Sequence, residues 1–478
     1  MHPVSISLRL LRIGLLYALL LPAAAQGQSS STLRDSVRAV LSRYLQNSGG
    51  ISAAVINTDG EVIAAANGFA SIGVPADSSL RFGIADLSQH LMAVMTLKLV
   101  ENGTTALTSS LGSGVVTGSA AVFPPATTIE QMLRHTSGIN SFAASPNYFN
   151  PATSFLFADL TFDFRTVNYT PVLGTYVAPQ GAASGAGTFK YSPTNYLVLG
   201  EKLESIQTAS LQQLLETLIL TPAGLDNISF YTPPQSFATT SAFYFNLSGL
   251  GPEQLSDQTS VLTSTGASGS MVATPSALVR YLRALLGGQI IDQTSLGLLT
   301  GFQSVTGRRS NAYGLGTERF ELTVNGRPET YIGHYGDLNY KALMLYSPED
   351  SIGVAILSNL QSQTADAIFS LAQELLTQVA VYNLQVGIGD LPEAPSRLRV
   401  FPNPAQSGTS FVRFEQQRAG VSPWTLRDLA GRTVRSGAPM LAAGVQEIEI
   451  PLQQLPAGAY LLSVTADGQT GTATLIVP

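Results

Sequence analysis

The chain has 478 residues, a formal net charge of −6, 45% hydrophobic and 12% charged residues, and no cysteine. This length predicts two or three domains, and the low charge with a large apolar fraction excludes a disordered chain. The acidic balance gives no electrostatic reason to bind nucleic acid, and the lack of cysteine excludes disulfides, zinc thiolates and thiol catalysis.

The N-terminus has the pattern of a secretory signal peptide. Arg9 and Arg12 precede a short apolar run, which small residues ending at Ala25 follow. A membrane anchor needs about 20 consecutive apolar residues, whereas this run is interrupted by Pro22. We therefore predict a signal peptide over residues 1–25, cleaved after Ala25, and an exported protein without a transmembrane anchor.

Residues 33–383 mix helices and strands in the manner of an α+β domain. Helices at each end, with antiparallel strands from both termini, imply a sheet that brings the two ends of the domain together. The predicted elements, in chain order, are a helix over 33–50 closed by Gly49-Gly50, a β-hairpin over 51–70 around Asp59-Gly60, a turn and long amphipathic helix over 81–103, a flexible loop over 179–187, a helix from Thr274 and Pro275 to Gly287-Gly288, strands over 329–360 and a helix over 364–382.

Residues 384–397 contain glycine and proline without sustained periodicity, and we predict a linker there. Residues 398–478 contain short alternating strands with frequent turns and no indicated helix, which is typical of an all-β sandwich. Its Trp424 is expected in the core.

The C-terminal segment contains the motifs VFPNPA, LRDLAGRTV and LPAGAYLLSV. In these motifs it resembles a type IX secretion C-terminal sorting domain. The resemblance implies handling by the type IX secretion machinery and delivery, via the periplasm, to the outer surface of a Gram-negative bacterium or beyond. A generic adhesive sandwich, with the large domain as its passenger, is the alternative.

The large domain contains, in order along the chain, the segments MTLKLVENG, IEQMLRHTSGI, KYSPTNYLVLGEKLE, GSMVATPSALVRYLRALLGG and IGHYG. In these segments and their order it resembles the serine β-lactamase and penicillin-binding protein superfamily, particularly its class C-like and carboxyesterase branch. The resemblance implies an antiparallel sheet flanked by helices plus a helical subdomain, and acyl transfer through a serine ester.

The family's first motif, Ser-x-x-Lys, falls on Asp86 and Gln89 when FGIADLSQ is aligned with it. Because Gln89 cannot accept a proton at a useful pH, general-base activation is absent. An attack by Asp86 on a carbonyl would give a labile anhydride. Ser88 is turned about 200° around the helix from Asp86 and is predicted to be a packing residue.

The other two motifs are partly kept. Tyr-x-Asn retains Tyr191 but has Pro193, which lacks a side-chain donor, in place of the amide; Asn195 is an alternative donor from a shifted loop. Lys/His-x-Gly is present as residues 334–336, after which a backbone N–H shapes the oxyanion hole. Asp337 follows, where the family carries a small uncharged residue, and its carboxylate would oppose an oxyanion.

Groups that act as a unit fail as a unit, so we predict a catalytically inactive domain that binds or scaffolds. The alternative is an active hydrolase (an esterase, D-alanyl-D-alanine carboxypeptidase or β-lactamase-like enzyme) with an unconventional nucleophile. The vestigial positions are Asp86, Gln89, Tyr191, Pro193, His334 and Gly336.

Three interpretations of this cleft remain open. Asp86 and His90 could form an ion pair one helical turn apart. A polar cleft could bind a cationic or sugar-like ligand or a cell-wall peptide. The carboxylates could also bind a divalent metal, although His90, His135 and His334 are too scattered to suggest a cluster. We expect no cofactor, and His135 should stabilise a turn. The residues of the polar cleft would be Asp86, Gln89, Tyr191, His334 and Asp337.

Overall fold

The computed structural model divides the chain into two compact units, a larger one over residues 30–383 and a smaller one after residue 383. The predicted signal peptide, residues 1–25, and residues 390–397 of the predicted linker lie outside the described residues. The structure describes residues 30–44, 49–116, 118–207, 209–233, 237, 239–246, 248, 250–389, 398–406, 408–467 and 469–477.

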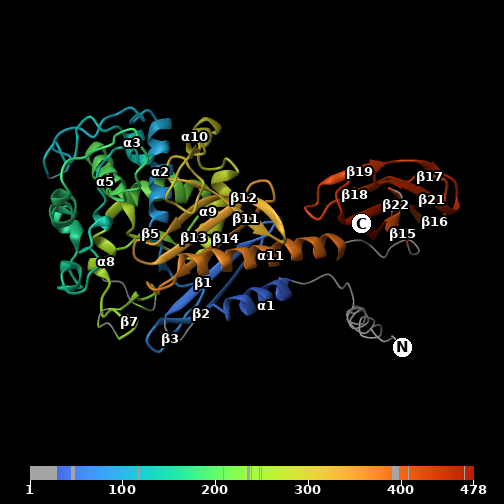
Figure 1. The fold of residues 1–478 in the computed structure, drawn as a ribbon, viewed down its shortest axis with the longest axis horizontal. Helices are drawn as coiled ribbons and strands as arrows, with labels where there is room; N and C mark the ends of the chain where they lie inside the picture. Colours follow the sequence, from blue (N-terminus) through green and yellow to red (C-terminus); the bar gives the residue numbers. More distant parts are fainter. Residues whose placement is uncertain are drawn as a thin grey trace, which may run out of the picture. The chain divides into compact units, whose positions relative to one another are not determined.

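A nine-stranded antiparallel sheet forms the frame of the larger unit (Figure 1). Its order is β3-β2-β1-β14-β13-β12-β11-β10-β9, so the first and last strands of the unit, β1 and β14, are neighbours, as predicted. The strands are β1 (Gly50–Ile56), β2 (Val62–Ser71), β3 (Val74–Pro75), β9 (Gln303–Ser304), β10 (Ala312–Tyr313), β11 (Glu318–Val324), β12 (Arg327–Gly336), β13 (Lys341–Ser347) and β14 (Ile352–Ser358).

Long helices pack against this sheet. α1 (Ser30–Leu41) is followed by a turn whose Tyr44 contacts Glu374 of α11 (Ala365–Gly389). α9 (Pro275–Leu286) packs against the central strands. Its predicted boundaries are confirmed, because the Thr274 side chain accepts a hydrogen bond from the Ala277 N–H and Gly287 is the C-cap.

A helical subdomain covers the end of the sheet that carries the candidate site. α2 (Leu87–Glu101) lies between this subdomain and strands β12 and β13, and twelve of its 15 residues are buried. The prediction of an amphipathic helix was therefore wrong, because neighbours cover α2 on nearly every side. The other α-helices here are α3 (Ile129–Leu133), α4 (Thr170–Val172), α5 (Thr194–Ile206), α6 (Leu211–Leu215), α7 (Thr221–Ala223), α8 (Thr259–Thr263) and α10 (Gln293–Leu299). Two small sheets, β4 (Phe82–Gly83) with β8 (Met271–Ala273) and β5 (Ile228–Phe230), and β6 (Tyr244–Phe245) with β7 (Glu253–Gln254), accompany them.

Two predicted boundaries differ from the structure. α1 ends at Leu41 rather than at Gly49-Gly50, because Gly50 is already the first residue of β1. α11 continues through Gly389 into the predicted linker. The first proline after this helix is Pro392, so nothing earlier in the sequence interrupts its backbone hydrogen bonds.

The smaller unit is a β-sandwich, as predicted. One sheet has the order β15-β16-β21, another β19-β18-β22-β23, and a ribbon joins β17 to β20. Trp424 is buried in its core. The strands are β15 (Arg399–Gln406), β16 (Thr409–Gln416), β17 (Gly420–Val421), β18 (Trp424–Arg427), β19 (Thr433–Gly437), β20 (Met440–Leu441), β21 (Gly444–Pro451), β22 (Gly458–Ala466) and β23 (Gln469–Val477).

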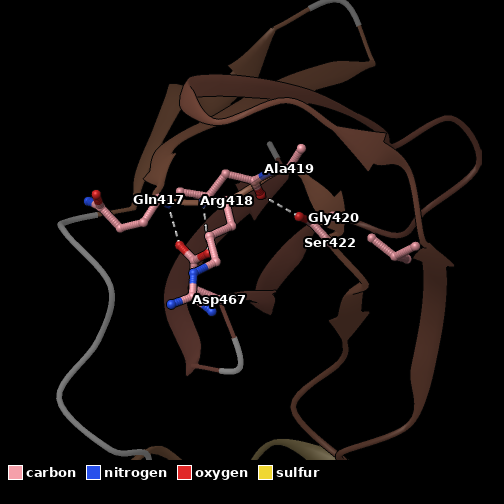
Figure 2. Close-up of a pocket in the computed structure, with 8 residues that line it drawn as sticks. Gln417, Arg418, Ala419, Gly420, Ser422 and Asp467 are labelled. Carbon is pink, nitrogen blue, oxygen red and sulfur yellow. Dashed lines mark hydrogen bonds between the residues drawn. The ribbon is translucent and has the colours of Figure 1, made fainter.

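A cavity of about 480 Å³ lies in the smaller unit between residues 416–422 and Asp467 (Figure 2). The Asp467 carboxylate accepts hydrogen bonds from the backbone N–H groups of Gln417 and Arg418. It thereby ties the loop after β16 to the turn between β22 and β23. Among the residues that the structure describes, no helix in either unit has the length and apolar character needed to cross a membrane.

Candidate functional site

The candidate site forms where the end of β12 meets the start of α2. A Cβ atom on Gly336 would lie 2.6 Å from the backbone nitrogen of Asp86, so only glycine permits this close approach. Ala85, just before Asp86, has a left-handed φ of 47°, which turns the chain sharply into the helix. The strand end and the helix start therefore hold Asp86 against the backbone that follows Gly336.

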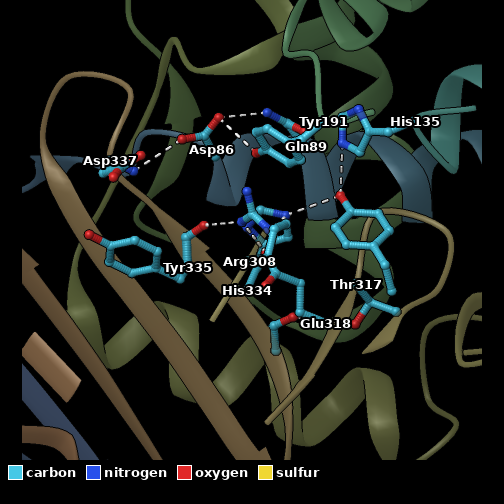
Figure 3. A network of polar contacts seen from close by, with 12 residues as sticks. Asp86, Gln89, His135, Tyr191, Arg308, Thr317, Glu318, His334, Tyr335 and Asp337 are labelled. Atoms are coloured by element: carbon cyan, nitrogen blue, oxygen red, sulfur yellow. Dashed lines mark hydrogen bonds and ion pairs between the residues drawn. The ribbon is translucent and has the colours of Figure 1, made fainter. Parts of the chain in front are cut away.

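The Asp86 carboxylate is buried and accepts four hydrogen bonds (Figure 3). Its Oδ1 accepts from Gln89 Nε2 at 2.7 Å and from the Tyr191 hydroxyl at 3.0 Å. Its Oδ2 accepts from the backbone N–H groups of Asp337 and Leu338, each at 3.1 Å. Both oxygens of the side chain at the nucleophile position are thus held by donors from the protein itself.

The position of Oδ2 bears on acyl chemistry. The N–H of residue 337 is the donor that the family resemblance places in the oxyanion hole, where it would stabilise the charge that develops on a substrate carbonyl. Here that N–H and its neighbour bind a carboxylate oxygen of Asp86. The internal carboxylate therefore takes the place that a substrate oxygen would need.

The pKa of Asp86 is raised to about 6, because burial and the nearby Asp337 carboxylate raise it by more than Arg308 and the hydrogen bonds lower it. The charged form is costly in a buried site, and the donors offset only part of that cost. Asp86 is accordingly an anion at neutral pH that gains its proton in mildly acidic solution.

A buried ion pair between Arg308 and Glu318 lies beside Asp86. The Arg308 guanidinium lies over the Tyr191 ring, 3.8 Å from its centroid, and Nη2 also donates to the Tyr335 carbonyl at 3.4 Å. Burial lowers the pKa of Arg308, but the charge and hydrogen bond of Glu318 and the nearby Tyr191 and Tyr313 together outweigh it, and the pKa rises well above its usual range. Arg308 is therefore a permanent cation that lies between the Tyr191 ring and the end of β12.

The sequence analysis missed Arg308 and Glu318. Neither residue belongs to a family motif, and Arg308 comes from an irregular segment between β9 and β10. The only available signal was the adjacent pair Arg308-Arg309 in a sequence with few charges, which does not by itself indicate burial.

His334 is fully buried and takes part in the ion-pair network. Its Nε2 lies 3.5 Å from Glu318 Oε1 and 3.3 Å from the Tyr313 hydroxyl. Burial, followed by the charge of Arg308, holds the pKa of His334 well below its usual range. The imidazole is therefore neutral at physiological pH and supplies no positive charge for a substrate.

The predicted ion pair between Asp86 and His90 is wrong. His90 Nδ1 lies 2.9 Å from the Tyr281 hydroxyl, and burial lowers the pKa of His90 to about 3. A neutral imidazole bonded to a tyrosine cannot balance the charge of Asp86. The prediction for Ser88 holds, because its hydroxyl is buried and accepts a hydrogen bond from the Met271 N–H at 3.3 Å.

His135 stabilises a turn, as predicted. Its Nδ1 accepts the Ser192 N–H at 3.2 Å, and its Nε2 lies 3.0 Å from the Tyr313 hydroxyl. Asn195, the alternative amide donor, contacts His135 and accepts from the Ser137 hydroxyl at 2.5 Å. Its amide is buried in these contacts and does not replace the one lost at Pro193, which is the N-cap residue of α5.

The structure thus brings Asp86, Gln89, Tyr191 and the backbone of Asp337 together, with His334 joined to them through Arg308 and Glu318. The Asp337 side chain is exposed, and its backbone makes the contact. Within the described parts of the chain, no group of three or more histidine, aspartate or glutamate side chains could hold a metal ion.

Two protein-family models match this chain. The family model described as beta-lactamase matches residues 37–378, and that of a secretion system C-terminal sorting domain matches residues 399–478.

Solved structures share the fold. A D-amino acid amidase from Ochrobactrum anthropi SV3, complexed with D-phenylalanine, is 18% identical with a TM-score of 0.56, over 74% of this chain and 99% of that one. A penicillin-binding protein from Bacillus halodurans is 19% identical with a TM-score of 0.57, over 70% and 98%. An octameric penicillin-binding protein homologue from Pyrococcus abyssi is 17% identical with a TM-score of 0.57, over 94% and 97%. At these identities the likeness concerns the fold alone.

Replacing Asp86 with Asn should remove a pH dependence of stability. A carboxyl with a folded-state pKa of about 6 holds its proton more tightly in the folded chain, so the unfolding free energy falls as pH rises toward and through 6. Between pH 5 and 7.5 we expect the wild type to lose about 1 kcal/mol relative to Asp86→Asn. Urea unfolding followed by helical circular dichroism measures this; parallel pH profiles would contradict it.

Replacing Arg308 with Met should leave Glu318 buried without its cation. Removing one partner of a buried ion pair typically costs about 3–5 kcal/mol of unfolding free energy, whereas replacing both is often neutral. The double variant Arg308→Met with Glu318→Gln should therefore recover most of the loss in the same unfolding assay. A single variant as stable as the wild type would mean that the pair is not desolvated.

Proposed function

The chain belongs to the beta-lactamase family. We propose that its large domain is a catalytically inactive member of this family and acts as an exported binding or scaffold protein. The sorting domain indicates secretion to the cell surface or outside the cell, with handling by the type IX secretion machinery. What the large domain does after export is the subject of the proposal.

The observation that carries the proposal is the position of the Asp86 carboxylate. A side chain able to form a stable acyl ester is missing at residue 86. The carboxylate in its place binds the Asp337 N–H, which the family resemblance places in the oxyanion hole, and the neighbouring Leu338 N–H. Gln89 donates to this carboxylate, so its amide orients Asp86 and removes no proton. Nucleophile, base and oxyanion site are all changed by one set of contacts.

The alternative, a hydrolase with Asp86 as nucleophile, has little support from these contacts. A carboxylate oxygen attacks with a free lone pair aimed at the carbonyl carbon, whereas both Asp86 oxygens already accept two hydrogen bonds each. The substrate carbonyl would also need the N–H groups that Asp86 holds. Ser88 offers no substitute, because it contacts the β8 backbone instead.

The proposal predicts that the wild-type chain forms no covalent adduct with a fluorescent penicillin or a fluorophosphonate. Intact-protein mass spectrometry after prolonged incubation measures this, with a penicillin-binding protein as the positive control. An adduct that maps to the large domain, and is lost when the labelled residue is changed, would contradict the proposal.

Restoring the family residues should restore part of the chemistry. In the triple variant Asp86→Ser, Gln89→Lys, Pro193→Asn, the carboxylate leaves the two N–H groups and a hydroxyl–amine pair occupies the helix start. We expect hydrolysis of p-nitrophenyl acetate at least about tenfold faster than in Asp86→Ala, Gln89→Lys, Pro193→Asn, which lacks only the hydroxyl. Equal rates in two folded variants would show that the missing motifs do not account for inactivity.

A further inference from the structure

A separate cavity of about 390 Å³ lies near the site around Asp86, at the β9 end of the large sheet. Its size falls within the range of small-molecule and short-peptide sites. Two stretches of backbone form its long walls, residues 303–306 from β9 onward and residues 187–189 after the loop over 179–187. Its lining residues are Arg134, Thr136, Gly187, Thr188, Phe189, Gln303, Ser304, Val305, Thr306 and Tyr313.

The first wall offers unused backbone groups. Among the strands of the described residues, β9 is the last at this end of the sheet, and its one strand partner there is β10. The Val305 N–H donates to the Asn311 carbonyl at 3.3 Å, so in the antiparallel alternation the next pair, Ser304 with Ala312, is one whose residues do not bond to each other. The alternation directs the N–H and C=O of Ser304 away from β10, toward the outer edge of the sheet.

The second wall is held in place from behind. The Gly187 N–H donates to the Thr136 carbonyl at 2.7 Å, and the Lys190 N–H donates to the His135 carbonyl at 2.8 Å. In the described part of the chain, no backbone hydrogen bond joins residues 187–189 to residues 303–306. The two walls are therefore fixed independently and leave a gap between them.

The lining is uncharged apart from one arginine. Phe189 and Tyr313 contribute adjacent rings, with centroids 5.4 Å apart, and the remaining side chains are mostly hydroxyls and amides. Arg134 is paired with Glu130 at 3.0 Å. Such a lining suits a ligand that is uncharged and presents its own N–H and C=O groups.

We propose that this cavity binds an extended, uncharged peptide segment, which adds as a strand to the outer edge of β9. Strand addition takes its affinity from main-chain hydrogen bonds and its selectivity from the side chains that line the groove. The inference rests on the proposed function and gives the binding protein its ligand class. The groove is separate from the site around Asp86, where Arg308 donates a hydrogen bond to the Tyr335 carbonyl of β12.

The test uses the full chain and a library of fluorescein-labelled, C-amidated pentapeptides of uncharged residues, measured by fluorescence polarisation. The tightest peptide is then remade with one N-methyl group at each position in turn. Because a strand directs alternate N–H groups to its partner, N-methylation should weaken binding at least tenfold at alternate positions and little between them. Ser304→Pro, which removes the outward N–H, should weaken binding at least tenfold, whereas Ser304→Ala should change it less than twofold.

Several outcomes would overturn the inference. They are binding of no peptide in the library, binding insensitive to N-methylation, and binding lost equally in Ser304→Ala and Ser304→Pro. Binding of neutral oligosaccharides in place of peptides would do the same. If Ser304→Pro lowers the melting temperature, the N-methyl series decides, because it leaves the protein unchanged. Mass spectrometry of the bound peptide keeps the two proposals apart: cleavage contradicts inactivity alone, whereas an intact but unbound peptide contradicts the groove alone.

Discussion

The contact between the Asp86 carboxylate and the backbone N–H groups of Asp337 and Leu338 is the constraint on which the rest of the site depends. It joins the start of α2 to the end of β12, two elements that Gly336 allows to approach closely. A buried carboxylate needs several donors to remain charged. Tyr191 and Gln89 supply the remaining donors.

Arg308 balances the buried negative charges of the site. Asp86 and Glu318 are both buried acids, and the Arg308 cation interacts with each of them. The guanidinium can do so because its planar group bonds to Glu318 while its face lies on the Tyr191 ring. His334 lies between Glu318 and Tyr313 and stays neutral, since protonation would add a second buried cation.

Tyr313 contacts both the polar network around Asp86 and the neighbouring groove. Its ring lines the groove, while its hydroxyl contacts both His135 and His334. The groove therefore lies against a buried polar network that contains both histidines. In the proposed function, the site around Asp86 supports the neighbouring groove through these contacts of Tyr313.

The sequence by itself determined the two-unit organisation, the α+β and β-sandwich classes and the positions of the vestigial motifs. These features could be recognised because the strands over residues 329–360, the capped helix after Thr274 and the spacing of the motifs are local patterns visible in a single sequence. It also placed Asp86 and Gln89 at the altered positions and identified Ser88 as a packing residue.

Only the tertiary structure decided what these residues do. One interpretation paired Asp86 with His90 four residues away, yet three of the four donors to Asp86 come from the distant residues 191, 337 and 338, and the fourth is Gln89. Arg308 and Glu318 could not be recognised, because burial of a charge depends on which distant segments surround it. The same reason explains α2, whose sequence was interpreted as amphipathic and whose burial is set by neighbours from both sides of the fold.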